Sequence, residues 1–300
     1  MQQLFLANLK FQTVLDSVAT RTVAEVFLPI TTNPQLEEWF VLHAFQESIH
    51  SASYADLIKA LPLNSTKVFD EIMVTPEIME RAQMIVDCFD DTIKHNALLT
   101  VESDLYNIED HNRSIIKSLY ALNILEAGLF QTSFITTFAF GENGIMESSS
   151  KSMGKISADE NNHYALTVYL INTLKKNSTY KYIFEELKPE IEAMYDAAAE
   201  ADYMWIDYIF RDDARLLGLS KPVLVQYSDW NMAKARKAIG LSSTKGLTNP
   251  CTWADKYTNI SNQQNANNES DSAAYLLGKI DKHVPLEFYE TLPGYRKEPT

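Results

Sequence analysis

The feature that most constrains the fold of this chain is the spacing Glu-x-x-His, which occurs at Glu47/His50 and again at Glu160/His163. Residues three apart lie on one face of a helix, so each pair offers an oxygen and a nitrogen ligand to the same point. A single pair is common on exposed helix faces, whereas two pairs on two long helical segments can face each other in a bundle. The pattern therefore predicts an all-α bundle with a four-ligand metal core.

Two further carboxylates complete the set that a dinuclear site of this kind needs. Glu126 lies within the otherwise apolar segment ALNILEAGLFQTSFITTFAF, and a buried carboxylate is costly unless it is paired or bound to a metal. Asp16 lies in the first predicted helix, at the end of FQTVLD. Two histidines and four carboxylates suit iron or manganese, and calcium is unlikely to be the metal because histidine is a poor ligand for it.

Capping residues and apolar periodicity predict helices along most of the chain. Asn33 and Thr75 are good N-caps and each precedes a proline, which is favoured in the first helical turn. Pro189 predicts a break or a kink in the helix that contains it. The expected helices cover residues 4–20, 34–61, 76 onward, 110–141, part of 147–177, 178–211 and 221–239.

The amino-acid composition and the apolar periodicity of the sequence change after about Lys256. NISNQQNANNESDS is rich in amides and has no helical apolar period, yet apolar and aromatic residues return in AAYLLGKI and PLEFYETLPGY. We therefore expect a helical domain over residues 1–258 and a flexible tail over 259–300. A flexible linker that ends in a short apolar segment is often a docking peptide, and a frayed terminus is the alternative.

Composition excludes several classes of function. Lys and Arg number 26 against 40 Asp and Glu, for a net charge of −14, and no basic patch for nucleic acid is visible. No apolar run reaches the roughly 20 residues that span a bilayer, so we expect no membrane partner. Cys88 and Cys251 form neither a metal pair nor a disulfide framework, which favours a reducing compartment, the cytoplasm.

Seven segments, in order, resemble the small, radical-generating subunit of class Ia ribonucleotide reductase. They are NLKFQTVLDSV, WFVLHAFQESIHSASYADLI, ALNILEAGLFQTSFITTFAFGE, ADENNHYALT, YIFRDDARLLGLSKPVLVQY, NPCTWADKY and AAYLLGKID. The resemblance implies a ferritin-like bundle with an oxo-bridged centre of two iron ions, manganese being the alternative metal. It implies the ligands Asp16, Glu47, His50, Glu126, Glu160 and His163, and a stable radical on Tyr54.

Physical arguments support the role of Tyr54. It follows His50 by four residues, so it shares a helix face with that ligand. Phe130, Phe134 and Ile156 lie on the helix faces of Glu126 and Glu160, and the resemblance implies that they wall the radical pocket. Packing in the core is the simpler interpretation of these three residues, and both interpretations hold at once.

Two residues are implied to connect the centre with a partner. Asp159 resembles the family's aspartate that accepts a hydrogen bond from a metal-bound histidine, here His50, and an exposed charge is the alternative. Tyr275 resembles the tail tyrosine that relays the radical. The resemblance implies a homodimer that docks through its tail to a large subunit, which reduces ribonucleotides to deoxyribonucleotides.

The sequence also departs from the family. The family usually has a longer segment before Asp16 with a tryptophan on the radical route. We expect that either a separate polypeptide supplies this segment or the chain is an incomplete gene product. His43 replaces a residue that is often aromatic, and it is either a hydrogen-bond partner of a ligand carboxylate or a satisfied core histidine. Two other classes stay open: a di-iron oxidase or desaturase, which would need neither Tyr54 nor Tyr275, and a non-enzymatic iron-binding bundle or part of a split subunit.

Overall fold

A computed structural model describes residues 2–72, 74–212, 214, 216–243 and 248–258. The chain divides into two units, Met1–Asn267 and Asn268–Thr300, and all described residues belong to the first. Within the described residues every regular element is helical, apart from one isolated bridge between Leu216 and Leu219. The all-α prediction is confirmed, whereas the predicted tail lies outside the described residues.

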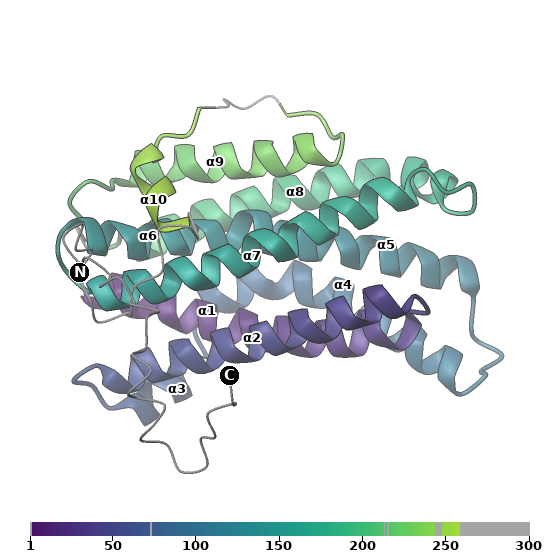
Figure 1. Ribbon diagram of the computed structural model, residues 1–300, viewed down its shortest axis with the longest axis horizontal. Helices are drawn as coiled ribbons and strands as arrows, with labels where there is room; N and C mark the ends of the chain where they lie inside the picture. The colour runs from purple at the N-terminus through teal and green to yellow at the C-terminus, as the bar shows by residue number, and fades with distance from the viewer. Residues whose placement is uncertain (1, 73, 213, 215, 244–247, 259–300) are drawn as a thin grey trace, which may run out of the picture. The chain divides into compact units, whose positions relative to one another are not determined.

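The bundle is built from long helices joined by short connections (Figure 1). The α-helices are α1 (Gln2–Thr22), α2 (Pro34–Ala60), α3 (Ser65–Ile72), α4 (Pro76–Thr100), α5 (Ile108–Ile124), α6 (Phe130–Glu142), α7 (Glu147–Leu174), α8 (Lys181–Ile209), α9 (Lys221–Ala238) and α10 (Asp255–Thr258). Shorter turns are the π-helices η1 (Val23–Phe27) and η3 (Leu125–Leu129) and the 3₁₀ helices η2 (Leu28–Ile30) and η4 (Thr252–Ala254).

The helix starts agree with the capping signals in part. The Asn33 side chain accepts hydrogen bonds from the backbone N–H groups of Gln35 and Leu36, at 3.0 and 3.1 Å, so α2 begins as predicted. Thr75 precedes α4, but its hydroxyl donates to the backbone carbonyl of Glu71 and does not cap the helix. Of the break or kink predicted at Pro189, the break is wrong, because α8 continues through this residue as one helix.

The segment predicted as one helix over residues 110–141 is interrupted. A π-helical turn, η3, joins α5 to α6 and places Glu126 inside it. Gly128 lets this turn pack closely on α9, since a Cβ atom there would lie 2.4 Å from Cε of Met232. Turns of this type often mark functional positions, because they rotate the side chains that follow.

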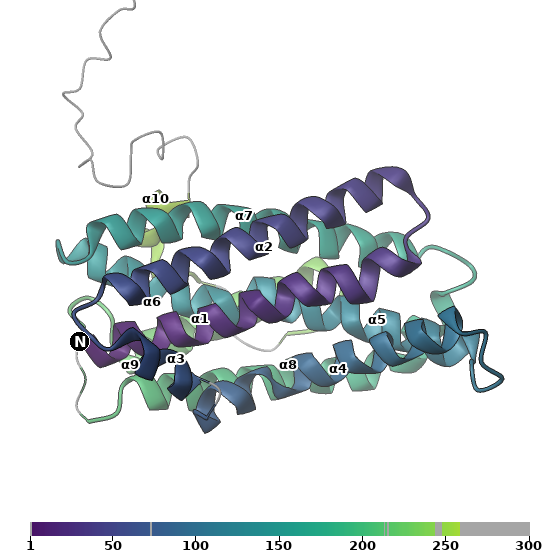
Figure 2. The ribbon, with the colours of Figure 1, turned by 90° about the horizontal axis from the view of Figure 1, so that it is seen from below.

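Four segments surround one interior point of the bundle. In both views α1 lies beside α2, and the long helices run in roughly one direction (Figures 1 and 2). Contacts also join α2 to α7, α5 and α6 to α7, and η3 to α7. The region between α1, α2, η3 and α7 is therefore enclosed on every side by helices. No helix among the described residues is long and apolar enough to cross a membrane.

Candidate metal centre

The structure brings all six predicted ligands together, although they come from four separate elements. Asp16 lies on α1, Glu47 and His50 on α2, Glu126 on η3, and Glu160 and His163 on α7. Their ligand atoms form two groups that share Glu47. The first group is Asp16, Glu47, His50 and Glu160, and the second is His43, Glu47, Glu126 and His163. Within each group the ligand atoms all lie within 4.8 Å of one another.

In the first group the inner nitrogen of His50 faces the carboxylates. His50 Nδ1 lies 3.0 Å from Glu160 Oε1, 3.7 Å from Asp16 Oδ2 and 3.8 Å from Glu47 Oε2. The outer nitrogen, Nε2, is 3.1 Å from Asp159 Oδ2. A histidine that binds a metal usually donates its other N–H to such an acceptor, which fixes the tautomer and the ring orientation.

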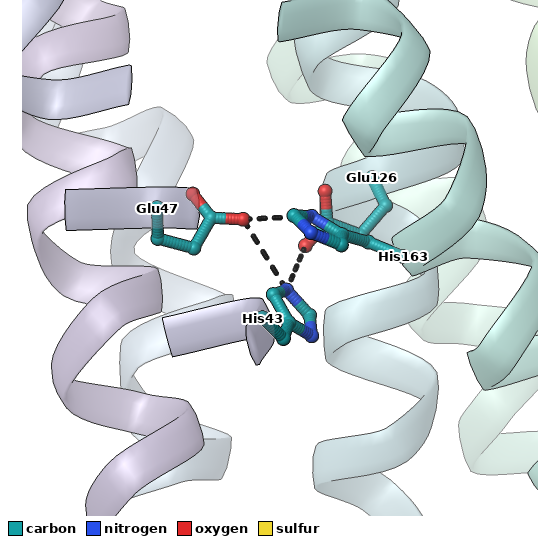
Figure 3. Close-up of side chains that lie close together, drawn as sticks. All are labelled: His43, Glu47, Glu126 and His163. Atoms are coloured by element: carbon teal, nitrogen blue, oxygen red, sulfur yellow. Dashed lines mark ion pairs between the residues drawn. The ribbon is translucent and has the colours of Figure 1, made fainter. Parts of the chain in front are cut away.

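In the second group His163 has the same arrangement. Its Nδ1 lies 2.9 Å from Glu47 Oε1 (Figure 3). The same nitrogen is 2.8 Å from Glu160 Oε2, and Nε2 donates to Gln46 Oε1 at 3.0 Å. Sequence reasoning missed Gln46, and nothing in the local sequence distinguishes it from an ordinary helix residue. Its partner is 117 positions away in the chain, so only the packing of α2 on α7 reveals the contact.

His43 belongs to this second group as well. It is fully buried, and its Nε2 lies 3.2 Å from Glu47 Oε1 and 3.4 Å from Glu126 Oε1. Neither of its ring nitrogens makes a hydrogen bond within the described part of the chain. His43 is therefore neither a satisfied core histidine nor, in this structure, a hydrogen-bond partner of a ligand carboxylate.

Many polar atoms of the cluster have no partner in the described protein. Both carboxylate oxygens of Asp16, Glu47 and Glu126 lack a hydrogen bond, as do Glu160 Oε1 and His50 Nδ1. Buried polar atoms in this state normally cost about 1–3 kcal/mol each, more when charged. Because these atoms converge from four elements on a shared space, they fit a pair of metal cations better than any packing role.

The pKa values of the clustered residues are shifted strongly, because the buried negative charges exceed the positive charges available in the protein. Burial and the Glu47 charge raise the pKa of Asp16 well above its usual range, and burial and the Glu160 charge do the same for Glu126. Burial and Glu47 oppose ionisation of Glu160, but the neighbouring His163 and His50 lower its pKa to about 2. Burial opposes protonation of His163, yet Glu160 and Glu47 raise its pKa to about 9. Without metal, protons therefore occupy the positions that cations would take.

The sequence matches the protein-family model for the ribonucleotide reductase small chain over residues 1–249. The chain belongs to this family. It is 34% identical over 303 residues to ribonucleoside-diphosphate reductase subunit beta of Haemophilus influenzae, covering 96% of this chain and 80% of that one.

Two solved structures of ribonucleotide reductase subunits share the fold. The R2 subunit from Clostridium botulinum has a TM-score of 0.74 at 23% identity, covering 86% of this chain and 77% of that one. The dimanganese(II) form of NrdF from Streptococcus sanguinis has a TM-score of 0.69 at 15% identity, covering 86% and 83%. The ferritin-like bundle expected from the resemblance is confirmed.

Tyr54 lies on the inner face of α2, close to the first group of the centre. It is fully buried on the same face of α2 as Glu47 and His50, and its hydroxyl interacts with the Asp16 carboxylate without forming a regular hydrogen bond. Burial raises the pKa of Tyr54 well above its usual range, so the phenol stays protonated. Phe130, Phe134 and Ile156 are buried in the same apolar cluster, and the rings of the two phenylalanines stack with centroids 6.1 Å apart.

Of the two residues expected to link the centre to a partner, the structure describes Asp159 but not Tyr275. Asp159 is about one-third exposed and contacts His50, so it connects the buried centre of this small chain with the surface. Tyr275 lies outside the described residues, and its role stays a prediction.

Proposed function

We propose that this chain is the radical-generating β subunit of a ribonucleoside-diphosphate reductase, active only together with a large subunit. The observation that carries the proposal is the convergence of four carboxylates and two Glu-x-x-His histidines, with buried Tyr54 one helical turn beyond His50. The radical equivalent formed at Tyr54 passes to the large subunit, which reduces ribonucleotides to deoxyribonucleotides. Membership of the small-chain family supports this assignment.

We propose Asp16, Glu47, His50, Glu126, Glu160 and His163 as the residues that hold two metal ions. Two iron ions, when bound, supply together with O₂ the oxidising equivalent that Tyr54 needs. Manganese is the alternative, since hard oxygen donors also suit it and a dimanganese structural relative shares the fold. Metal analysis tests the ligand set: His163→Ala should lower the content from two ions per chain to about one, whereas a single ion in the fully loaded wild type would contradict it.

The chain's own residues would prepare Tyr54 for one-electron oxidation. Its high pKa means that the phenolic proton must leave with the electron, and the Asp16 carboxylate is the base that faces the hydroxyl. Phe130, Phe134 and Ile156 would keep water and reductants away. With metal bound, Asp16 would be a deprotonated carboxylate that can accept this proton, and the neutral tyrosyl radical would remain buried.

Aerobic reconstitution of the full chain with Fe(II) tests the function. We expect a tyrosyl EPR signal in the wild type and in Tyr120→Phe, a control that removes another buried tyrosine hydroxyl. Tyr54→Phe should retain its metal and lose the signal. A persistent tyrosyl signal in Tyr54→Phe would place the radical on another of the fifteen tyrosines.

Asp159 is proposed to carry the radical equivalent outward from His50, with Tyr275 as a later relay in the tail of residues 259–300. Asp159→Ala should keep the EPR signal and lower nucleotide reduction in the presence of the large subunit. Unchanged turnover would remove Asp159 from the route. That a separate polypeptide supplies a further part of the route stays a prediction, and a turnover assay with and without such a polypeptide tests it.

We propose that the chain forms a homodimer, with α2 contributing to the contact. Val41, Leu42, Phe45 and Ile49 follow one another at helical spacing on the exposed face of α2, and each is about half exposed. A contiguous apolar stripe of this kind is unusual on the free surface of a monomer. Light scattering of Phe45→Glu should then show a monomer where the wild type shows a dimer.

Cys88 and Cys251 are both free, which supports a cytoplasmic location.

A further inference from the structure

His43 lies one helical turn before Glu47, on the face of α2 that points into the centre. Its imidazole is fully buried, and both ring nitrogens lack a hydrogen bond within the described residues. The bundle leaves a polar ring unsatisfied at considerable cost, since packing alone would be served better by an apolar side chain. This position therefore needs an explanation other than packing.

A second buried histidine shows what a structural role looks like in the same bundle. His111 of α5 is also almost fully buried, but its Nε2 lies 2.8 Å from Asn96 Oδ1 and its Nδ1 lies 3.1 Å from the Tyr106 hydroxyl. Both nitrogens of His111 are thus satisfied by protein groups. His43 differs because its Nε2 points instead at two carboxylates that themselves have no hydrogen-bond partner.

Aromatic contacts hold the His43 ring in this orientation. It stacks on His163 with ring centroids 3.6 Å apart and an interplanar angle of 22° (Figure 3). Trp39 meets both imidazoles edge-on, with centroids 5.7 Å from His43 and 5.9 Å from His163. Two stacked imidazoles therefore lie beside the same carboxylates, each with a nitrogen facing Glu47. Because the lone pair of an imidazole nitrogen lies in the plane of its ring, the two rings must tilt apart for both nitrogens to bind one ion.

The distances from the two histidine nitrogens to the carboxylate oxygens are those of donors around one ion. Donors bound to a first-row metal at about 2.1 Å, with bonds near right angles, stand roughly 3 Å apart. His43 Nε2 is 3.2 Å from Glu47 Oε1 and 3.4 Å from Glu126 Oε1, and His163 Nδ1 is 2.9 Å from the same Glu47 oxygen.

We propose that His43 is a seventh ligand of the dinuclear centre, binding through Nε2 to the ion that Glu126 and His163 also hold. The two ions then differ: one has two imidazoles and two carboxylates, and the other has the single imidazole of His50 with three carboxylates. This inference rests on the proposed function, because it presupposes the dinuclear centre. A second imidazole ligand favours iron over manganese. The ion site that contains His43 is therefore the more iron-selective of the two.

A crystal structure of the full chain loaded anaerobically with Fe(II) tests the proposal directly. We expect two ions, one of them with His43 Nε2 at about 2.1–2.3 Å. Two ions with Nε2 beyond about 3 Å, in hydrogen-bond contact with Glu126 Oε1, would overturn the proposal and make His43 a positioning residue. Absence of both ions would instead contradict the proposed function, so the two failures are distinguishable.

Variants measure the contribution of the ligand in solution. Competition with a chelator should show that His43→Phe, which retains an aromatic ring on His163, weakens one of the two Fe(II) binding steps by at least about 10-fold. The matched control His111→Phe should leave both steps unchanged, because His111 lies outside the centre. Equal affinities in His43→Phe and the wild type would overturn the proposal.

Chemical rescue separates a ligand from a hydrogen-bond donor. His43→Gly leaves a space of the size of an imidazole beside His163. Imidazole and 1-methylimidazole both carry a lone pair on nitrogen, but only imidazole has an N–H to donate. Recovery of the weakened Fe(II) step by both compounds is the expected result. Recovery by imidazole alone would show that the N–H matters, and would overturn the assignment as a ligand.

Discussion

Two buried polar clusters in this bundle differ in how their charges are balanced. In one, Arg81 of α4 donates to Asp202 of α8, and the second Asp202 oxygen accepts hydrogen bonds from Thr132 and Ser228, each at 2.6 Å. In the metal centre, four carboxylates and three histidines leave most of their inner atoms without partners. The first cluster is nearly complete as the chain folds, whereas the second is complete only when cations enter it.

The balanced cluster also supports the unbalanced one. Arg81 Nη2 donates to the backbone carbonyl of Leu129 at 2.8 Å, at the end of the π turn η3 that carries Glu126. The guanidinium group lies 3.8 Å from the centroid of the Phe11 ring, on the helix that carries Asp16. The Arg81–Asp202 cluster therefore holds the helices whose positions determine where two of the carboxylates point.

The largest expected effect comes from breaking the balanced cluster. Asp202→Ala leaves Arg81 as an unpaired buried charge, which should lower the free energy of unfolding of the metal-free chain by about 3–5 kcal/mol. Urea denaturation of the chelator-treated protein measures it. As a control, the double variant Arg81→Met/Asp202→Leu should recover most of the loss. A loss below about 1 kcal/mol for Asp202→Ala would show that the two clusters do not differ in this way.

Metal loading should have the next largest effect, because it completes the second cluster. Fe(II) added anaerobically at about 100 times its dissociation constant should raise the free energy of unfolding by about 2.7 kcal/mol for each occupied site. The gain should be smaller in Arg81→Met/Asp202→Leu, since that variant keeps every residue of the centre but loses the contacts that position Glu126 and Asp16. Thermal unfolding with and without Fe(II) provides the measurement, and no gain would contradict the idea that cations complete the cluster.

Removing one carboxylate should stabilise the metal-free centre. Burial raises the folded pKa of Glu126 above its unfolded value, so stability falls as the pH rises past the unfolded pKa. Glu126→Gln should therefore have a higher free energy of unfolding than the wild type at pH 7, and this gain should vanish near pH 4. Urea denaturation at both pH values checks this.

The matched change in the balanced cluster should act in the opposite direction. Asp202→Asn removes a charge that Arg81 needs, so it should destabilise the metal-free chain at pH 7. If Glu126→Gln and Asp202→Asn shifted stability in the same direction, the contrast between the clusters would be lost.

The smallest effect is expected for Tyr54→Phe. Because the Tyr54 hydroxyl has no regular hydrogen bond, its removal should change the free energy of unfolding by less than about 0.5 kcal/mol. Tyr195→Phe is the comparison: its hydroxyl donates to Asn123 Oδ1, and its loss should cost about 1 kcal/mol. A larger loss for Tyr54→Phe than for Tyr195→Phe would mean that the Tyr54 hydroxyl has a structural role.

The sequence alone determined the helical class, most helix limits and the six residues that converge at the centre. These are local properties: a proline after Asn33 marks a helix start, and Glu-x-x-His places two donors on one face because a helix turns every 3.6 residues. His50 as the partner of Asp159 was expected from the resemblance to the family and not from the local pattern, and the two side chains lie 3.1 Å apart.

Tertiary structure decided what depends on residues distant in the chain. The π turn at Glu126 forms where α9 packs on Gly128 and Arg81 binds Leu129, and neither contact has a local signal. The orientation of His43 is set by stacking on His163, which is 120 positions further along the chain. A helical pattern shows which face a side chain occupies, but only the packing of α2 against α7 and η3 determines which atoms that face meets, because contact distances depend on how the helices are placed.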